Sequence, residues 1–209
     1  VTLGDYTDAV IYELHVRDFS SDESGKFTLR GKFGAFCEKA VNGFGETIGL
    51  DYIKKLGVTH IHLLPVSDYQ SVDESDPDAG FNWGYDPLNY NIPEGSYSTD
   101  PHHGEVRVRE FKQLIQAAHE RGIGIIMDVV YNHTYATEDS PFNKTCPGYY
   151  YRHNADGSLS NGSACGNEFA SERAMAGRFI ADSLLYWARE YHIDGFRFDL
   201  MGLYDVETI

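Results

Sequence analysis

The stretch Ile193–Leu200 reads Ile-Asp-Gly-Phe-Arg-Phe-Asp-Leu, and its pattern decides the fold. Apolar and polar residues alternate in it, and an alternation of period two predicts a β-strand with two different faces. Arg197 and Asp199 then share one face, while the other face carries apolar side chains. Charged groups that point into a protein core are costly unless they are paired. We therefore expect an Arg197–Asp199 ion pair in which Arg197 favours the ionised carboxylate.

A second polar cluster lies upstream, in the largely apolar stretch Ile123–His133. Asp128 and Asn132 share one face of this predicted strand, and His133 follows at its end. We expect Asp128 to brace Arg197 from the neighbouring strand, with Asn132 and His133 where a ligand would lie. A buried structural ion pair and a structural histidine are the alternatives, but two polar clusters on neighbouring strand ends favour a functional site.

Strand-like and helix-like segments alternate along the chain. Strands are expected at Ala9–Phe19, Val58–Val66, Ile123–His133 and Ile193–Leu200, and helices at Gly49–Leu56, Arg107–Arg121 and Ser171–Tyr191. This order predicts an α/β fold with a parallel sheet, and continuous apolar runs fit strands covered on both faces. We predict a partial (β/α)8 TIM barrel over residues 1–209, with about the first four βα units. A doubly wound sheet is the alternative, but no glycine-rich phosphate-binding turn follows the first strand.

Two long loops follow predicted strand ends, at residues 67–105 and, as an insertion after the third strand, at residues 134–170. Loops longer than about 12–15 residues are usually functional, and in a TIM barrel such loops build the active site. The first contains Phe-Asn-Trp-Gly-Tyr-Asp-Pro at residues 81–87. Trp83 and Tyr85 could stack on the apolar face of a sugar while Asp86 binds its hydroxyls. A small aromatic core under the loop is the alternative.

Composition excludes several classes of partner. The chain has 209 residues and a formal net charge of −15, which argues against nucleic acid or an anionic membrane because phosphate binding needs Lys and Arg. No apolar stretch is long enough to span a bilayer. The first residues lack the features of a signal peptide, and a secreted, cell-surface or cytoplasmic location all stay open.

The cysteines and histidines do not predict a metal site. No C-x-x-C pair occurs among the three cysteines, so zinc is not expected. Cys146 and Cys165 flank one loop, and they could form a disulfide or stay free thiols. Neither the pair His60-x-His62 nor the adjacent pair His102-His103 has carboxylates at spacings that would complete a metal site.

Three motifs, in this order, resemble the alpha-amylase superfamily, glycoside hydrolase family 13. Asp128–His133 is similar to the first signature region of that family, and Gly195–Asp199 to the second. Residues 81–87 resemble the Y-N-W-G-Y-D-P motif of its type I pullulanases, with Phe81 in place of the first tyrosine. Pro147–Gly166 also resembles that group.

The resemblance implies roles for the residues at the matching positions. Asp199 would be the nucleophile that attacks the anomeric carbon, and Arg197 would orient it and keep it ionised. His133 would hydrogen-bond the sugar in the subsite before the cleaved bond, and Tyr85 would stack beneath that sugar.

Two further residues would support that site. Asp128 would hold Arg197, and Asn132 would order the surrounding groups. The chemistry would need no cofactor, although in some amylases the residue that matches Asn132 binds calcium, so calcium stays open.

The implied reaction needs a second carboxylate. Retaining glycosidases use two carboxylates about 5–5.5 Å apart, and Asp199 supplies one. The family takes the acid/base glutamate and a further aspartate from later strands, so we expect both beyond Ile209. The chain would then be the N-terminal half of the barrel and would be inactive alone. The complete enzyme would cleave α-1,6-glucosidic branch linkages in pullulan, amylopectin or glycogen with retention of the anomeric configuration. Its partners would be α-glucan and the rest of the barrel. Another alpha-amylase-family glucan hydrolase and a non-catalytic glucan-binding fragment are the alternatives.

Overall fold

A four-stranded parallel sheet forms the centre of the computed structural model, which describes residues 3–209. Its strands, in spatial order, are β1 (Ile11–Leu14), β4 (His60–Leu63), β7 (Gly124–Val129) and β8 (Gly195–Phe198). Every neighbouring pair is parallel. Spatial order therefore follows chain order, as the partial barrel requires, and the predicted fold class is confirmed.

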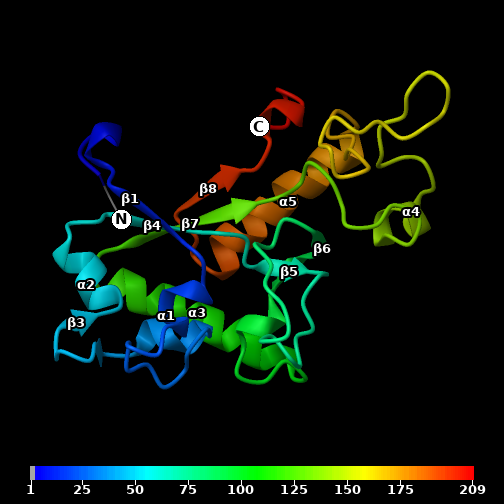
Figure 1. The fold of residues 1–209 in the computed structure, drawn as a ribbon. Coiled ribbons are helices and arrows are strands. Elements are labelled where there is room, and N and C mark those ends of the chain that lie inside the picture. The colour runs from blue at the N-terminus through cyan, green and yellow to red at the C-terminus, as the bar shows by residue number, and fades with distance from the viewer. Residues whose placement is uncertain (1–2) are drawn as a thin grey trace.

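Three helices connect these strands and lie on one side of the sheet (Figure 1). They are α2 (Leu50–Lys55), α3 (Gly104–Glu120) and α5 (Ala174–Glu190). In α3, Phe111, Leu114, Ile115 and Ala118 recur at helical spacing and are all buried, which makes one apolar stripe. The chain leaves α3 through Gly122, whose φ of +67° favours glycine. Ile61 and Ile125, paired in the sheet, are fully buried under this layer.

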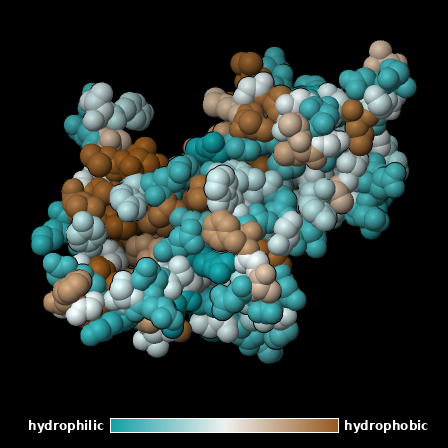
Figure 2. Space-filling view, viewed as in Figure 1, coloured by the Kyte–Doolittle hydropathy of each residue, from teal (hydrophilic) through white to brown (hydrophobic). Residues whose placement is uncertain are grey.

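The opposite face of the sheet, which would be the inside of the barrel, is partly open. At the amino ends of the strands a groove of about 720 Å³ includes Leu3, Ala9, Ile11 and Ile126 in its lining. Figure 2 shows a hydrophobic area there, beside the N-terminal segment. Toward the carboxyl ends the same face becomes charged, since Asp128 lies opposite Arg197 in the register.

Several predicted boundaries are wrong. The first strand covers only Ile11–Leu14 of the predicted Ala9–Phe19, because the chain turns at His15, whose carbonyl accepts from the amide of Phe19. Helix α1 (Asp18–Ser21) follows directly. The last long helix begins at Ala174, three residues after the predicted start. The remaining short elements are η1 (Tyr6–Asp8), η2 (Phe33–Cys37), β2 (Ala40–Val41), β3 (Thr47–Ile48) and η4 (Met201–Leu203).

The segment 67–105, predicted as a loop, contains an antiparallel pair of strands. These are β5 (Ser67–Tyr69) and β6 (Pro87–Pro93), and η3 (Gly95–Tyr97) follows. The indole of Trp187 donates to the carbonyl of Tyr90 at 3.0 Å, and the hydroxyl of Tyr90 donates to the carbonyl of His133 at 2.6 Å. The hairpin is thereby fixed over the carboxyl ends of the sheet strands.

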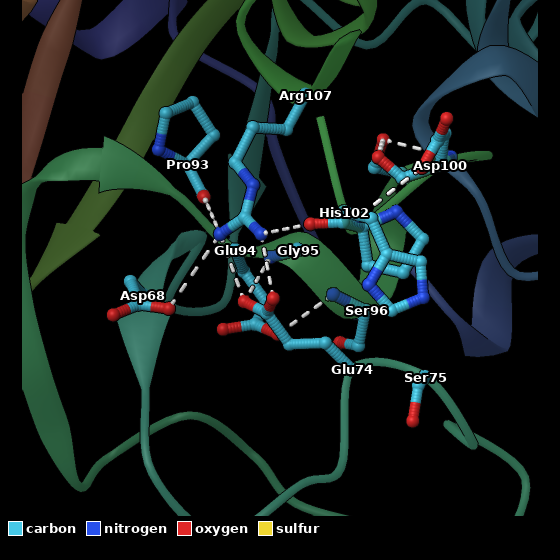
Figure 3. A network of polar contacts seen from close by, with 12 residues as sticks. Asp68, Glu74, Ser75, Pro93, Glu94, Gly95, Ser96, Asp100, His102 and Arg107 are labelled. Atoms are coloured by element: carbon cyan, nitrogen blue, oxygen red, sulfur yellow. Dashed lines mark hydrogen bonds and ion pairs between the residues drawn. The ribbon is translucent and has the colours of Figure 1, made fainter. Parts of the chain in front are cut away.

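Arg107 at the start of α3 ties this hairpin to the helix layer (Figure 3). Its guanidinium donates to both carboxylate oxygens of Glu74, at 2.8 and 2.5 Å, and to the carbonyl of Pro101 at 2.9 Å. Asp68 lies 3.8 Å from the same group. Glu94 is fully buried nearby and accepts from two backbone amides. A bidentate arginine–carboxylate pair fixes orientation as well as distance, so the base of the aromatic loop has a defined position.

The insertion at 134–170 extends beyond the end of α5 (Figure 1), and Phe169 within it belongs to the main hydrophobic core. It contains α4 (Pro141–Thr145) and is packed around Tyr151 and Phe169, both buried. Cys146 and Cys165 are exposed free thiols, so they do not form the disulfide that the sequence left open. Within residues 3–209, none of the helices is both long enough and apolar enough to cross a lipid bilayer.

Candidate active site

The predicted ion pair and its brace are both present at the carboxyl ends of β7 and β8. Arg197 Nη1 donates to Asp199 Oδ1 at 2.8 Å and to Asp128 Oδ1 at 3.1 Å. Asp128 is 0% exposed, and a buried carboxylate without a partner would be strongly destabilising. Although partial burial opposes its charge, the hydrogen bonds to the two carboxylates raise the pKa of Arg197. Arg197 is therefore a permanent cation beside Asp199.

Asp199 is held from a second side and remains accessible. Asn132 Nδ2 donates to Asp199 Oδ2 at 3.1 Å and to its carbonyl at 3.0 Å. The side chain of Asp199 is 16% exposed. Leu200, the next residue, has a left-handed backbone with φ of +47°, a conformation that only glycine adopts without strain. The chain therefore turns sharply directly after the carboxylate, which is oriented and reachable, as a nucleophile must be.

Tyr85 from the aromatic loop joins this cluster. Its hydroxyl donates to Asp128 Oδ2 at 2.8 Å. Burial, and then the hydrogen bond to Asp128, raises the pKa of Tyr85, so the phenol stays protonated and keeps donating. The position predicted for a sugar-stacking ring is thus fixed by the same carboxylate that holds Arg197.

His133 is buried beside Tyr85 and Asn132. Its Nε2 lies 2.9 Å from the carbonyl oxygen of Tyr85, and its Nδ1 faces the side-chain oxygen of Asn132. Burial lowers the pKa of His133, against the smaller opposite effect of the Tyr85 carbonyl. Both nitrogens have protein partners here, and the role of His133 as a sugar ligand stays a prediction.

The aromatic loop forms an open groove of about 520 Å³ beside this cluster, lined by Ser71, Phe81, Asn82, Trp83, Tyr85 and Asp86. Trp83 is 62% exposed. A large aromatic surface in water at the edge of a groove is suited to stacking on an apolar sugar face. Trp83 therefore lies where a bound glucan could reach it.

The turn between Trp83 and Tyr85 requires glycine. Gly84 has φ of +91°, and a Cβ there would lie 2.9 Å from Cβ of Pro65. Asp86 closes the same turn, because its two oxygens accept from the amide of Ser71 at 2.8 Å and from Asn82 Nδ2 at 2.7 Å. These bonds give Asp86 a structural task, and its contact with sugar hydroxyls stays a prediction.

Three residues of this region were missed from the sequence. His15 Nε2 faces the carbonyl of Asn82 at 2.9 Å and the hydroxyl of Tyr97 at 3.0 Å, so it supports the aromatic loop. His62 lies 3.3 Å from Asp128 and 3.2 Å from Glu13. The signal in the sequence is the pair of polar residues Glu13 and His62, which lie opposite each other on the inner face of β1 and β4.

The groups of this region that could hold a metal ion also have partners within the protein. Among residues 3–209, Asp68, Glu74 and Glu94 form a group of carboxylates close enough to share an ion, but the Arg107 guanidinium is bonded to Glu74 and lies beside Asp68. The amide of Asn132, the position matched to a calcium ligand in some amylases, is bonded to Asp199 and faces His133.

Comparisons with known proteins agree with this geometry. The family described as alpha amylase, catalytic domain, matches residues 36–157. A pullulanase of Bacillus subtilis is 51% identical over 97% of this chain, and pullulanase 1 of Arabidopsis thaliana chloroplasts is 39% identical over 96% of it. The chain spans 28% and 24% of the lengths of these two relatives.

Solved structures that resemble this chain are also those of pullulanases. The crystal structure of a pullulanase from Paenibacillus barengoltzii, in complex with maltohexaose and alpha-cyclodextrin, has a TM-score of 0.97 and 55% identity. It matches 99% of this chain, which covers 33% of that one. The type I pullulanase of Bacillus subtilis complexed with maltose has a TM-score of 0.95 at 51% identity, over 96% of this chain and 28% of that one.

Proposed function

Since this chain belongs to the alpha-amylase family, we propose that it carries the nucleophile of a retaining glycoside hydrolase that cleaves α-1,6-glucosidic branch linkages. The observation that carries the proposal is the bonded cluster of Asp128, Arg197 and Asp199 beside Tyr85. Pullulan, amylopectin and glycogen are the substrates we expect. The relatives named pullulanase, and the maltooligosaccharides in their structures, support an α-glucan ligand.

The geometry suits the first half of a double displacement. A carboxylate oxygen of Asp199 forms the bond to the anomeric carbon as the bond to the leaving oxygen breaks. Arg197 donates to one oxygen of this carboxylate and orients it, and Asn132 holds its other oxygen. The ring of Tyr85, fixed through its hydroxyl, would lie beneath the reacting sugar. Positioning and charge stabilisation of this kind supply much of the rate in such reactions.

The general acid must come from a different group than Asp128. That carboxylate is fully buried and bonded to Arg197 and Tyr85, so it cannot reach a leaving oxygen. We propose that the acid/base residue belongs to a part of the protein outside these 209 residues, on the rest of the catalytic barrel.

The nucleophile is tested in the full-length protein. Asp199→Ala is expected to lower kcat on pullulan by roughly 10⁴-fold or more, since loss of a nucleophile removes the covalent route. Maltotriose as the product would identify α-1,6 cleavage, whereas other products would indicate another alpha-amylase-family hydrolase. Asp139→Ala, at an exposed position, is the control that should keep full activity. Unchanged turnover in the Asp199 variant would contradict the assignment.

A non-catalytic glucan-binding role is the second candidate, and the exposed ring of Trp83 favours it. The 209-residue chain alone is expected to bind maltotetraose weakly and to hydrolyse nothing. Hydrolysis by this chain that disappears with Asp199→Ala would show that it needs no further acid. Binding without hydrolysis by the full-length protein would make binding its function.

We also propose that the chemical step needs no metal, because Arg197 already supplies the positive charge beside Asp199. Dialysis of the full-length protein against EDTA should leave kcat on pullulan unchanged while any bound calcium is lost. A fall in kcat that added calcium reverses would show that the site depends on the ion.

A further inference from the structure

His62 lies between two carboxylates on the inner face of the sheet. Its Nδ1 is 3.2 Å from Glu13 Oε2, and its Nε2 is 3.3 Å from Asp128 Oδ2. The ring is buried, at 7% exposure. The mechanism proposed above gives neither Glu13 nor His62 a task, although a buried histidine between two acids is costly to build unless both contacts are used.

The strand register brings these groups together. Glu13 lies directly opposite His62 in the parallel register of β1 and β4. His62 in turn lies opposite Ile126 on β7, so Asp128 is two residues further toward the carboxyl end of the sheet. The histidine ring spans this stagger. A continuous polar chain therefore crosses all four strands, through Glu13, His62, Asp128, Arg197 and Asp199.

Asp128 connects this series of polar side chains to the candidate active site. Its Oδ2 atom accepts from the hydroxyl of Tyr85 at 2.8 Å and from Arg197 at 3.2 Å, and it also faces His62. Three partners on one oxygen fix the rotation of the carboxylate about its Cα–Cβ and Cβ–Cγ bonds. Without His62, the carboxylate could rotate and take both Tyr85 and Arg197 with it.

We infer that His62, braced by Glu13, is a positioning residue that fixes the Asp128 carboxylate and thereby aligns Tyr85 and Arg197 for the reaction. This role deepens the proposed function and rests on it. Displacements of about 1 Å at supporting positions can lower the rate by roughly 100-fold, so the effect is large enough to measure.

The first test compares two histidines of one strand in the full-length protein. His62→Leu should lower kcat on pullulan by on the order of 10- to 100-fold. His60→Leu is the matched control, because His60 is equally buried two residues earlier on β4 and is bonded to Thr59 instead of a carboxylate. His62→Gln, whose amide can still donate to Asp128, should recover part of the loss. Wild-type kcat in His62→Leu, or an equal loss in His60→Leu, would overturn the inference.

The second test asks whether Glu13 acts through His62. Glu13→Gln should lower kcat several-fold in the wild-type background. It should have no further effect in His62→Leu, because the effects of substitutions at two residues that act through each other are not additive. Full additivity of the two losses would overturn the role of Glu13.

A structural measurement separates this inference from the proposed function. If the wild-type protein does not cleave pullulan, the proposed function fails and the positioning role is judged from crystal structures alone. The full-length His62→Leu protein should then show Tyr85 and Arg197 displaced from Asp128, and the His60→Leu protein should not. A retained 2.8 Å contact between Tyr85 and Asp128 in His62→Leu would overturn the inference.

Discussion

At the scale of the residue, Asp128 organises the site although it would not react. It is fully buried, and it binds Arg197 from the neighbouring strand and Tyr85 from the aromatic loop. Hydrogen bonds to an ionised group are about twice as strong as neutral ones. The proposed stacking of Tyr85 on sugar and the proposed orientation of the nucleophile would therefore depend on one carboxylate, and changes at either partner should affect the other.

Tyr85→Phe measures the contribution of the Tyr85 hydroxyl alone, because it removes only that group. The variant keeps the ring but leaves Asp128 without one donor, so the ring is no longer fixed. We expect kcat of the full-length protein on pullulan to fall by roughly 10- to 150-fold, the equivalent of roughly 1.5–3 kcal/mol for a hydrogen bond to a charged group. Tyr85→Ala should in addition raise KM, because the stacking surface is lost. Equal KM values in the two variants would contradict a stacking role for the ring.

Sequence patterns were sufficient for part of the site and insufficient for the rest. Arg197, Asp199 and Asp128 were predictable because charged residues that recur at period two in apolar strands must be paired with one another to be tolerated there. Glu13 and His62 acquire a meaning only from the register of β1, β4 and β7, which the sequence alone does not reveal. Asn132 was expected to order the site, and the structure shows it bonded directly to Asp199.

At the scale of the element, the β5–β6 hairpin could not be predicted. Its two strands are separated by the aromatic segment and are rich in Asp, Asn and Pro, which favour turns. Contacts from other elements stabilise it, above all the pair between Arg107 of α3 and Glu74 (Figure 3). Such a tertiary pair overrides local propensity, and so the position of the aromatic loop depends on a helix that begins after it.

The buried acid of this hairpin predicts a pH dependence of stability. Burial raises the pKa of Glu94 to about 7, while its backbone hydrogen bonds act in the opposite direction. Between the ordinary pKa of a glutamate and about 7, the folded state holds a proton that the unfolded state releases, so stability falls as pH rises through this window. The loss should be on the order of 3 kcal/mol and complete above about pH 7.

Glu94→Gln should remove this part of the pH dependence. Melting temperatures of the full-length wild type and variant, measured at pH 5 and pH 7.5, should diverge as pH rises, with the wild type losing more. Glu105→Gln, at an exposed position of α3, is the control and should follow the wild type. Parallel curves for wild type and Glu94→Gln would show that Glu94 does not titrate in this range.

At the scale of the whole molecule, the central sheet has two open edges. β1 and β8 lie at the two ends of the order β1-β4-β7-β8, and Ile11 and Tyr12 on β1 are exposed. Unpaired strand edges bind other strands. The 209-residue chain made alone is therefore expected to associate, as sedimentation velocity would show, and Ile11→Lys should weaken that association. A wild-type chain that stays monomeric would contradict this.

The left-handed backbone of Leu200 links stability to activity. A non-glycine residue in that conformation costs about 1–2 kcal/mol, and here the strain lies directly after the proposed nucleophile. Glycine at this position would relieve the strain but would also loosen the backbone that carries Asp199. Thermal stability and turnover would thus favour different residues at position 200.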